Sequence, residues 1–539
     1  MYINQEILVG KSDDKNLSIL PNMANRHGLI TGASGSGKTI TLKVMAESFS
    51  DAGVPVFLAD VKGDLAGTAF AGESSDSLQK RIDNLKLEAF DYKAFPVRFW
   101  DIYGVGGHPI RATIADVGPE ILSIMLGLSE AQEGNLAIAF AVAKDEGLKL
   151  IDLEDLRAVL QHVSDGRKTY TTKYGNITPQ SIGVIQRSLL TLENQGANNF
   201  FGEPALNISD FFTTEADGRG TINIMHAVKL FESPDLYASF MLWLLTKLFT
   251  NSPEVGDLDK PRMVFFFDEA HLLFSGMPTY RLKRIAQIVK LIRSRGIGLY
   301  FISQAPTDIP DSIITQLGNR VQHTLRAYTP AEQKTVRAAA AAFRVNKAFD
   351  TEQAILELGT GEALISFLDH KGAPSVVEKA IILPPQSRMG AIDDISRQKI
   401  INISPLAGKY DETINAESAK EQLEKATTQP IVEPVTTPAQ QLSVPQPAPA
   451  QNTTTPSNNA LDNINRYNES LASRRANNAP APAQEPLTKT EAKKAETAKT
   501  KAEKKQAKKI EKYTDRFIGN VIGRAGSKLG DKLFKNIFK

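Results

Sequence analysis

The chain of 539 residues contains no cysteine, which excludes disulfide bonds and thiolate metal sites. Its seven histidines are scattered and show no metal-binding spacing. Apolar runs such as residues 240–245 and 264–267 fall far short of the length that spans a bilayer. The first residues, MYINQEILVGK, lack the apolar core of a secretory signal. We therefore expect a cytoplasmic protein.

The chain as a whole has almost no excess of either charge sign, since 63 Lys and Arg oppose 61 Asp and Glu for a formal net charge of +2. The balance is uneven, because residues 487–539 hold sixteen Lys and Arg against six Asp and Glu. The preceding part is therefore mildly acidic and the tail is basic. An acidic body argues against a large phosphate-binding footprint on its surface.

One stretch, Gly32-Ala33-Ser34-Gly35-Ser36-Gly37-Lys38-Thr39, matches the phosphate-binding loop G-x-x-x-x-G-K-[ST]. Glycines allow the turn in which backbone N–H groups surround phosphate oxygens. Lys38 is expected to reach the β and γ phosphates, and the Thr39 hydroxyl to bind Mg²⁺. A short apolar run precedes the loop and an amphipathic helical pattern follows it, so the helix N-terminus would face the phosphates. The sequence predicts a nucleotide-binding protein.

Strand and helix patterns alternate through the first 404 residues, which predicts an α/β fold with a mostly parallel sheet covered on both faces. Residues 116–195 read as an α-helical insertion. Residues 405–486 are rich in Pro, Thr, Gln, Ala and Asn and are predicted to be a disordered linker. Residues 487–539 place apolar side chains at helical spacing among Lys and Arg, which predicts a basic amphipathic tail.

Hydrolysis requires more than a phosphate loop: an acid to hold Mg²⁺ and a residue to orient the attacking water. The most apolar strand pattern, VFFF, ends in Asp268 and Glu269. We assign Asp268 to the metal, through water, and Glu269 to the attacking water. Gln304 follows the strand pattern GLYFIS and is a candidate sensor of the γ-phosphate. The position of two acids directly after an apolar strand, in a chain that also has a phosphate loop, supports ATP hydrolysis. The alternative is that the strand simply ends in two solvated acids.

Other polar residues leave alternatives open. Asp60 and Lys62 follow a further apolar strand pattern and are expected to face the same site. An arginine supplied in trans would stabilise charge on the transferring phosphoryl group, and spacing does not choose among Arg293, Arg295, Arg320 and Arg326. His27 and His271 are interpreted as structural.

Five motifs, in order NRHGLITGASGSGKT, FLADVKGDLAG, FFFDEAHLLF, RSRGIGLYFISQAPTDIP and GTGEALISFLD, together resemble the HerA/FtsK class of P-loop ATPases, and more closely the bacterial HerA-like proteins. The resemblance covers about residues 1–400. It implies a P-loop NTPase of the RecA/FtsK-like type that uses ATP and Mg²⁺.

By the same resemblance, Lys38 and Thr39 bind phosphate and Mg²⁺, Asp268 and Glu269 are the Walker B pair, and Gln304 is the sensor. Arg326 or Arg295 is then the arginine that acts in trans. Proteins of this class are typically hexameric rings that move DNA. HerA itself carries a barrel domain before its phosphate loop, and 31 residues are too few for one. Asp268 to His271 also spell DEAH, but the long separation of the two nucleotide motifs disfavours a superfamily 2 helicase.

Two classes of client remain open. A ring acting on DNA predicts basic residues facing a pore, with Lys283, Arg284 and Lys290 as candidates. Alternatively, the basic tail at residues 487–539 recruits a protein or an anionic membrane surface, which would make the protein peripheral at the inner face of the membrane. The tail has two further possible roles. It forms a helix that docks on its own or a neighbouring subunit, or residues 493–512 bind nucleic acid nonspecifically.

Overall fold

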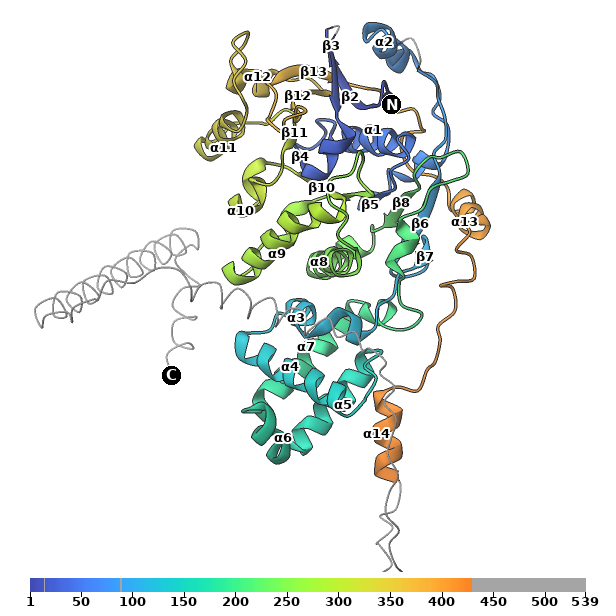
Figure 1. The fold of residues 1–539 in the computed structure, drawn as a ribbon, viewed down its shortest axis with the longest axis vertical. Helices are drawn as coiled ribbons and strands as arrows, with labels where there is room; N and C mark the ends of the chain where they lie inside the picture. Colours follow the sequence, from blue (N-terminus) through green and yellow to red (C-terminus); the bar gives the residue numbers. More distant parts are fainter. Residues whose placement is uncertain (14, 88–89, 429–539) are drawn as a thin grey trace, which may run out of the picture. The chain divides into compact units, whose positions relative to one another are not determined.

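The computed structural model describes residues 1–13, 15–87 and 90–428. They form a 13-stranded sheet with helices on both faces (Figure 1). The strands are β1 (Tyr2–Ile3), β2 (Glu6–Ser12), β3 (Lys15–Ile19), β4 (Gly28–Thr31), β5 (Val56–Asp60), β6 (Val97–Asp101), β7 (His108–Pro109), β8 (Ile222–His226), β9 (Met263–Phe267), β10 (Ile297–Ser303), β11 (Asn319–Gln322), β12 (Glu362–Ser366) and β13 (Glu378–Ile382).

The α-helices alternate with these strands. They are α1 (Lys38–Asp51), α2 (Asp76–Asn84), α3 (Ile114–Met125), α4 (Glu130–Asp145), α5 (Leu153–Asp165), α6 (Arg167–Tyr174), α7 (Pro179–Asn194), α8 (Pro234–Asn251), α9 (Thr279–Ile292), α10 (Asp311–Ile314), α11 (Pro330–Ala341), α12 (Thr351–Glu357), α13 (Asp394–Ile403) and α14 (Ala419–Thr428).

The sheet is parallel over most of its width. Strands β11, β4, β10, β9, β5, β8, β6 and β7 are neighbours in this order, and every adjacent pair is parallel. Beyond β11 the sheet continues with the antiparallel strands β12, β13, β2 and β1, and β3 pairs with β2. The prediction of a mostly parallel α/β sheet is confirmed.

Strand β9 is buried along its whole length, since helices cover both faces of the sheet. Val264 and Phe266 belong to the core that contains α1, whereas Phe265 and Phe267 belong to the core on the other face, with α8 and α9 (Figure 1). A strand packed on two sides requires apolar residues at every position. This explains the unbroken run VFFF.

Five helices, α3 to α7, connect β7 to β8. Three of these helices, α3, α5 and α7, are capped at their starts: Thr113, Asp152 and Thr178 each accept a hydrogen bond from a backbone N–H of the first turn. Helix α3 packs against α8, and Leu122 of α3 shares a core with Leu242 of α8. This bundle occupies the chain region where an α-helical insertion is predicted.

Helix α8 is buried over most of its circumference, as its nearly continuous apolar sequence requires. Its burial comes from the sheet on one side and α3 on the other. Within the part of the chain that the structure describes, no helix combines the length and the apolar character needed to cross a membrane.

Residues 405–428, the first part of the predicted linker, belong to the ordered body. Tyr410 is 1% exposed, its ring centroid lies 5.7 Å from that of Trp100, and its hydroxyl donates to Asp210. Helix α14 packs on α5, and the Ala419 amide donates to the carbonyl of Lys149 at 2.9 Å. The prediction of disorder is therefore wrong for residues 405–428, because average composition hides a single buried aromatic anchor. Residues 429–486 and the predicted tail at 487–539 lie outside the described residues.

Candidate nucleotide site

The phosphate loop follows β4 at the carboxyl edge of the parallel strands. Gly32, Gly35 and Gly37 have φ values of 156°, 77° and 117°, which side chains other than hydrogen rarely permit. A Cβ at Gly32 would lie 2.5 Å from the Cβ of His323. Helix α1 begins directly after Gly37, at Lys38. The loop thus places a helix N-terminus and its unpaired N–H groups around one point.

Neighbouring segments brace this loop from behind. The Ala33 amide donates to the carbonyl of Thr324 at 2.8 Å, and the Gly361 amide donates to the carbonyl of Ser36 at 3.0 Å. Both partners come from the segment between β11 and β12. Sequence reasoning missed these roles, although Gly361 stands in the quoted motif GTGEALISFLD, which was the available signal.

His323 supports the same region from within the core. Its Nε2 lies 2.8 Å from the Thr41 hydroxyl of α1, and its Nδ1 lies 2.8 Å from the carbonyl of Glu362. Nδ1 must donate to that carbonyl, so Nε2 accepts from the hydroxyl. Burial lowers the pKa of His323 to about 4, and this neutral tautomer is the form that satisfies both partners.

Lys38 lies inside the loop and is 8% exposed. Its Nζ donates to the carbonyls of Gly32 and Ala33 at 2.7 and 3.1 Å. Burial lowers the pKa of this ammonium, while the nearby carboxylates of Glu269 and Asp268 oppose that shift. The structure therefore brings the predicted lysine and the predicted acidic pair into one electrostatic site.

The acidic pair follows β9 at the same edge of the sheet. Strand β10 lies between β9 and β4, pairing Phe301 with Phe267 and Ser303 with Thr31. The Tyr237 hydroxyl donates to the Asp268 carbonyl at 2.8 Å. Burial and the neighbouring Glu269 carboxylate raise the pKa of Asp268 to about 6. A cation at this site would reverse the destabilisation of the charged carboxylate.

Gln304 and Arg326 are both exposed and line one cavity of about 530 Å³ beside the loop. Ala33, Ser34 and His271 line it as well. Gln304 follows β10 directly, and Arg326 follows β11. Both residues thus reach the loop side of the sheet, and their predicted roles stay predictions.

Arg295 lies elsewhere. It belongs to the 3-10 turn η7 (Arg293–Arg295) at the amino end of β10, whereas the loop lies at the carboxyl end, a separation of about 20 Å for a seven-residue strand. Its guanidinium donates to the Ser252 carbonyl and lies 4.4 Å from the centre of the Phe249 ring. Within one chain the structure does not bring Arg295 to the phosphate loop.

Two other arginines are engaged locally. Arg320 donates to the carbonyls of Leu317 and Ala342, and Arg293 lies 3.4 Å from Asp257. His27 is buried between the carbonyl of Val289 and the amide of Leu299, in keeping with a structural role.

The carboxylate of Asp60 is engaged within its own turn, where it accepts hydrogen bonds from the amides of Gly63, Asp64 and Leu65. This carboxylate shapes the turn after β5. Lys62, in that turn, is close enough to contribute to the electrostatics of Lys38 and Asp268. Of the two expected site residues, only Lys62 contributes to the electrostatics of both Lys38 and Asp268.

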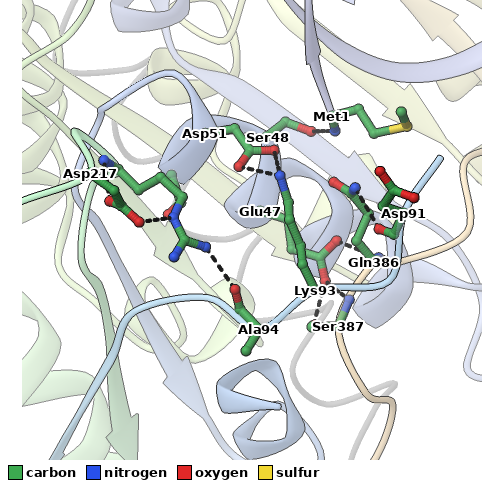
Figure 2. Close-up of polar contacts among 12 residues, drawn as sticks. Met1, Glu47, Ser48, Asp51, Asp91, Lys93, Ala94, Asp217, Gln386 and Ser387 are labelled. Atoms are coloured by element: carbon green, nitrogen blue, oxygen red, sulfur yellow. Dashed lines mark hydrogen bonds and ion pairs between the residues drawn. The ribbon is translucent and has the colours of Figure 1, made fainter. Parts of the chain in front are cut away.

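Helix α1 is anchored by the buried carboxylate of Glu47, more than two turns after the phosphate loop (Figure 2). Glu47 is 1% exposed and accepts from the amides of Gln386 and Ser387 at 2.8 and 3.1 Å, and from the Ser387 hydroxyl. Lys93 forms an ion pair with Asp51 at 2.8 Å nearby (Figure 2). These contacts fix the helix whose N-terminus forms the phosphate site.

The residues present fit ATP with Mg²⁺. The Ser36 hydroxyl is buried and makes no hydrogen bond within the described residues, and the Lys38 ammonium donates there to loop carbonyls alone. Phosphate oxygens are acceptors that would satisfy both groups. Thr39, in the first turn of α1, and Asp268, at the end of β9, supply the hard oxygen ligands that Mg²⁺ prefers.

The sheet is mostly parallel and flanked by helices, a glycine-rich loop leads from β4 into α1, and an acidic pair ends β9, with β10 between the two strands. These features define a P-loop NTPase of the RecA/FtsK-like type. Comparison with protein families agrees. The family model described as helicase HerA-like C-terminal matches residues 5–530. The chain belongs to this family.

Curated relatives share low sequence identity with it. The DNA double-strand break repair helicase HerA of Saccharolobus solfataricus is 23% identical over 377 residues, which is 66% of this chain and 64% of that protein. The protein of the same name from Sulfolobus acidocaldarius is 21% identical over 370 residues, 67% of this chain and 66% of the relative. The chain thus spans less than two thirds of the length of these relatives.

Two solved structures are also similar. The bacterial conjugative coupling protein TrwBdeltaN70 is 14% identical, with 69% of this chain and 88% of that chain covered and a TM-score of 0.44. VirB4 of Thermoanaerobacter pseudethanolicus is 14% identical, with 70% and 97% covered and a TM-score of 0.46. The fold assignment rests on the strand order and the loop described above.

Proposed function

We propose that this chain is a Mg²⁺-dependent ATP hydrolase of the HerA/FtsK class. The observation that carries the proposal is the placement of Asp268 and Glu269 at the edge of the sheet that holds the phosphate loop, with Lys38 in their electrostatic field. A loop alone supports binding, whereas an acidic pair at this place supports attack by water.

The residues divide the chemistry as follows. Lys38 and the loop amides bind the β and γ phosphates. The Thr39 hydroxyl and the Asp268 carboxylate would hold Mg²⁺. Bound Mg²⁺ supplies charge neutralisation on the phosphate oxygens. Glu269 orients the attacking water and accepts its proton. Gln304 and an arginine, for which Arg326 is the better placed candidate, act on the γ-phosphate side.

The direct test is the rate of ATP hydrolysis by the purified protein, with Glu269→Gln as the blank and the exposed Glu73→Gln as the matched control. We expect hydrolysis by the wild type and by the control, and loss of about 100-fold or more in the blank. ATP binding should persist in Glu269→Gln. Equal rates in all three proteins would refute the enzyme assignment.

We further propose that the client is DNA and that the working form is a hexameric ring. The HerA relatives are described as DNA double-strand break repair helicases, which supports a DNA client. The outer face of α9 supports it as well, because Lys283 and Lys290 are exposed there and form no ion pair with any described residue. Arg284, the third candidate, is paired with Glu120. Stimulation of hydrolysis by double-stranded DNA, and sedimentation as a hexamer with Mg²⁺ and ATP, are the expected results.

A second candidate function rests on the basic residues at 487–539. Their charge favours an anionic membrane surface or an acidic protein as the client of the ATPase, with the protein cytoplasmic and peripheral at the inner membrane face. Deleting residues 487–539 separates the two readings. If the shortened protein no longer floats with anionic vesicles but its hydrolysis is still stimulated by DNA, the tail binds lipid. If DNA no longer stimulates hydrolysis, the tail binds nucleic acid.

A further inference from the structure

The residue that links the acidic pair to the cavity beside the phosphate loop is His271. It lies in the 3-10 turn η6 (Ala270–Leu273), directly after Glu269 and Ala270. Its ring lines the cavity together with Ser34, Gln304 and Arg326. The side chain is 34% exposed, so it is reachable from the cavity and still packed on the protein.

The carboxylate of Glu269 is held close to this ring. Oε2 of Glu269 lies 3.4 Å from Nδ1 of His271, and the carboxylate side chain is 12% exposed. Both atoms are buried, and neither makes a hydrogen bond within the described residues. Two complementary groups, one acceptor and one ring nitrogen, therefore face each other without another partner.

The backbone at Glu269 is strained in a way that aims this side chain. Glu269 has φ 47° and ψ 45°, a left-handed conformation uncommon for a residue with a side chain. Neighbouring contacts hold it there: its amide donates to Oδ1 of Asp268 at 2.9 Å, and its carbonyl accepts from Leu272 at 3.1 Å. Such strain persists where surrounding structure enforces it, and it concentrates at functional sites.

We propose that His271 is a positioning residue for Glu269: Nδ1–H of the ring donates to Oε2, which fixes the carboxylate and leaves Oε1 to bind the attacking water. The inference rests on the proposed hydrolysis. A carboxylate on a freely rotating side chain spends little time in the reactive geometry, and a misplacement of about 1 Å costs up to about 100-fold in rate. No proton leaves His271 in this role.

The alternative is that His271 contacts the nucleotide from the cavity. No hydrogen bond among the described residues involves its Nε2, which leaves this second nitrogen for a ligand in the cavity. The two roles differ in the nitrogen used and in the kinetic constant affected. Positioning of Glu269 acts on kcat, while a contact to bound ATP acts on KM as well.

Three substitutions separate these roles. Asn places an amide donor near the position of Nδ1, Gln places one near Nε2, and Ala removes both. We expect His271→Ala and His271→Gln to lower kcat about tenfold with KM for ATP unchanged, and His271→Asn to retain most of the wild-type kcat. His370→Ala, at an exposed histidine, is the control and should match the wild type.

Melting temperatures of all variants establish that they fold, and His271→Asn keeps the test decisive if His271→Ala does not. Equal losses in His271→Asn and His271→Ala, a raised KM at constant kcat, or wild-type kinetics in every variant would each overturn the inference. The proposed function is judged separately, by the wild-type rate against Glu269→Gln. An active wild type that is insensitive to position 271 refutes the positioning role alone.

Discussion

The amide of Gly361 donates to the carbonyl of Ser36 at 3.0 Å, so a residue from the last part of the ordered body supports the phosphate loop near its beginning. Gly361 has φ 77°, and a Cβ there would lie 2.6 Å from a guanidinium nitrogen of Arg81. Arg81 itself donates to the Gly361 carbonyl at 2.5 Å. The loop that binds phosphate thus depends on α2 and on the turn before β12.

This contact predicts the effect of Gly361→Ala. The added methyl group must displace the Arg81 guanidinium and also adopt an unfavourable φ, so the loop loses its support. We expect ATP affinity to fall about tenfold and stability to fall by about 1–2 kcal/mol. Gly408→Ala is the matched control, because Gly408 has φ 80° and nothing within 4 Å of the added Cβ. It should show the stability loss without the change in ATP affinity; a drop in affinity in both variants would count against the support role.

Asp268→Asn should stabilise the nucleotide-free protein at neutral pH. In the folded chain the pKa of Asp268 is raised to about 6 from an ordinary value of 3.8, so ionisation opposes folding. The folded state binds the proton more tightly than the unfolded chain, and the wild type loses stability as pH rises from about 4 to 6. Asn does not ionise and escapes this loss.

Melting temperature measured without nucleotide checks that prediction. The variant should melt higher than the wild type at pH 7.5, by about 1 kcal/mol in stability, and the difference should shrink towards pH 4. The same variant should lose the Mg²⁺-dependent stabilisation by ATP. A difference that stays constant with pH would contradict the electrostatic cause.

Glu47→Ala should destabilise the protein strongly. The buried carboxylate accepts two backbone amides and one hydroxyl, and its removal leaves these donors without partners. We expect a loss of about 3 kcal/mol, seen as a lower melting temperature. Glu73→Ala, at an exposed position, is the control. A variant as stable as this control would mean that water replaces the carboxylate and that α1 is anchored elsewhere.

Substitutions of the two candidate arginines, Arg326 and Arg295, should have different effects. Arg326→Ala removes an exposed side chain that lines the cavity beside the phosphate loop, and we expect about 100-fold slower hydrolysis at an unchanged melting temperature. Arg295→Ala removes a side chain packed on Phe249, and we expect a lower melting temperature as its main effect. Mixing Arg326→Ala with Lys38→Ala subunits tests action in trans: partial recovery of the rate supports it. Slow hydrolysis by a stable Arg295→Ala would reverse this assignment.

If DNA is the client, the outer face of α9 should contribute to its binding. Replacing Lys283 and Lys290 together by Ala should reduce DNA stimulation and lower the salt slope of DNA affinity by about 2, while basal hydrolysis stays unchanged. Lys334→Ala, at an exposed position on α11, serves as the control. DNA affinity and salt dependence equal to those of the wild type would remove α9 from the interface.

Local patterns predict much of this site. The spacing of the glycines with Lys38, and the acids after VFFF, depend on neighbouring residues in the chain, because a phosphate loop and a strand that ends at an acid are short-range structures. The α/β alternation likewise follows from the periodicity of each segment. These features were readable without knowledge of any long-range contact.

Tertiary structure alone decides which distant segments meet. Strand order has no local sequence signature, and three features of the site follow from it. Strand β10 lies between β4 and β9, and Gly361 and Thr324 support the loop. Arg326 lies at the cavity, whereas Arg295 lies at the opposite edge of the sheet. The average composition of the predicted linker also gave no sign that Tyr410 is buried. Its packing against Trp100 orders residues that were predicted to be linker. Short motifs in the sequence determine the chemical groups of the site. The contacts that support the site, and the end of the ordered body, depend on packing between segments far apart in the chain.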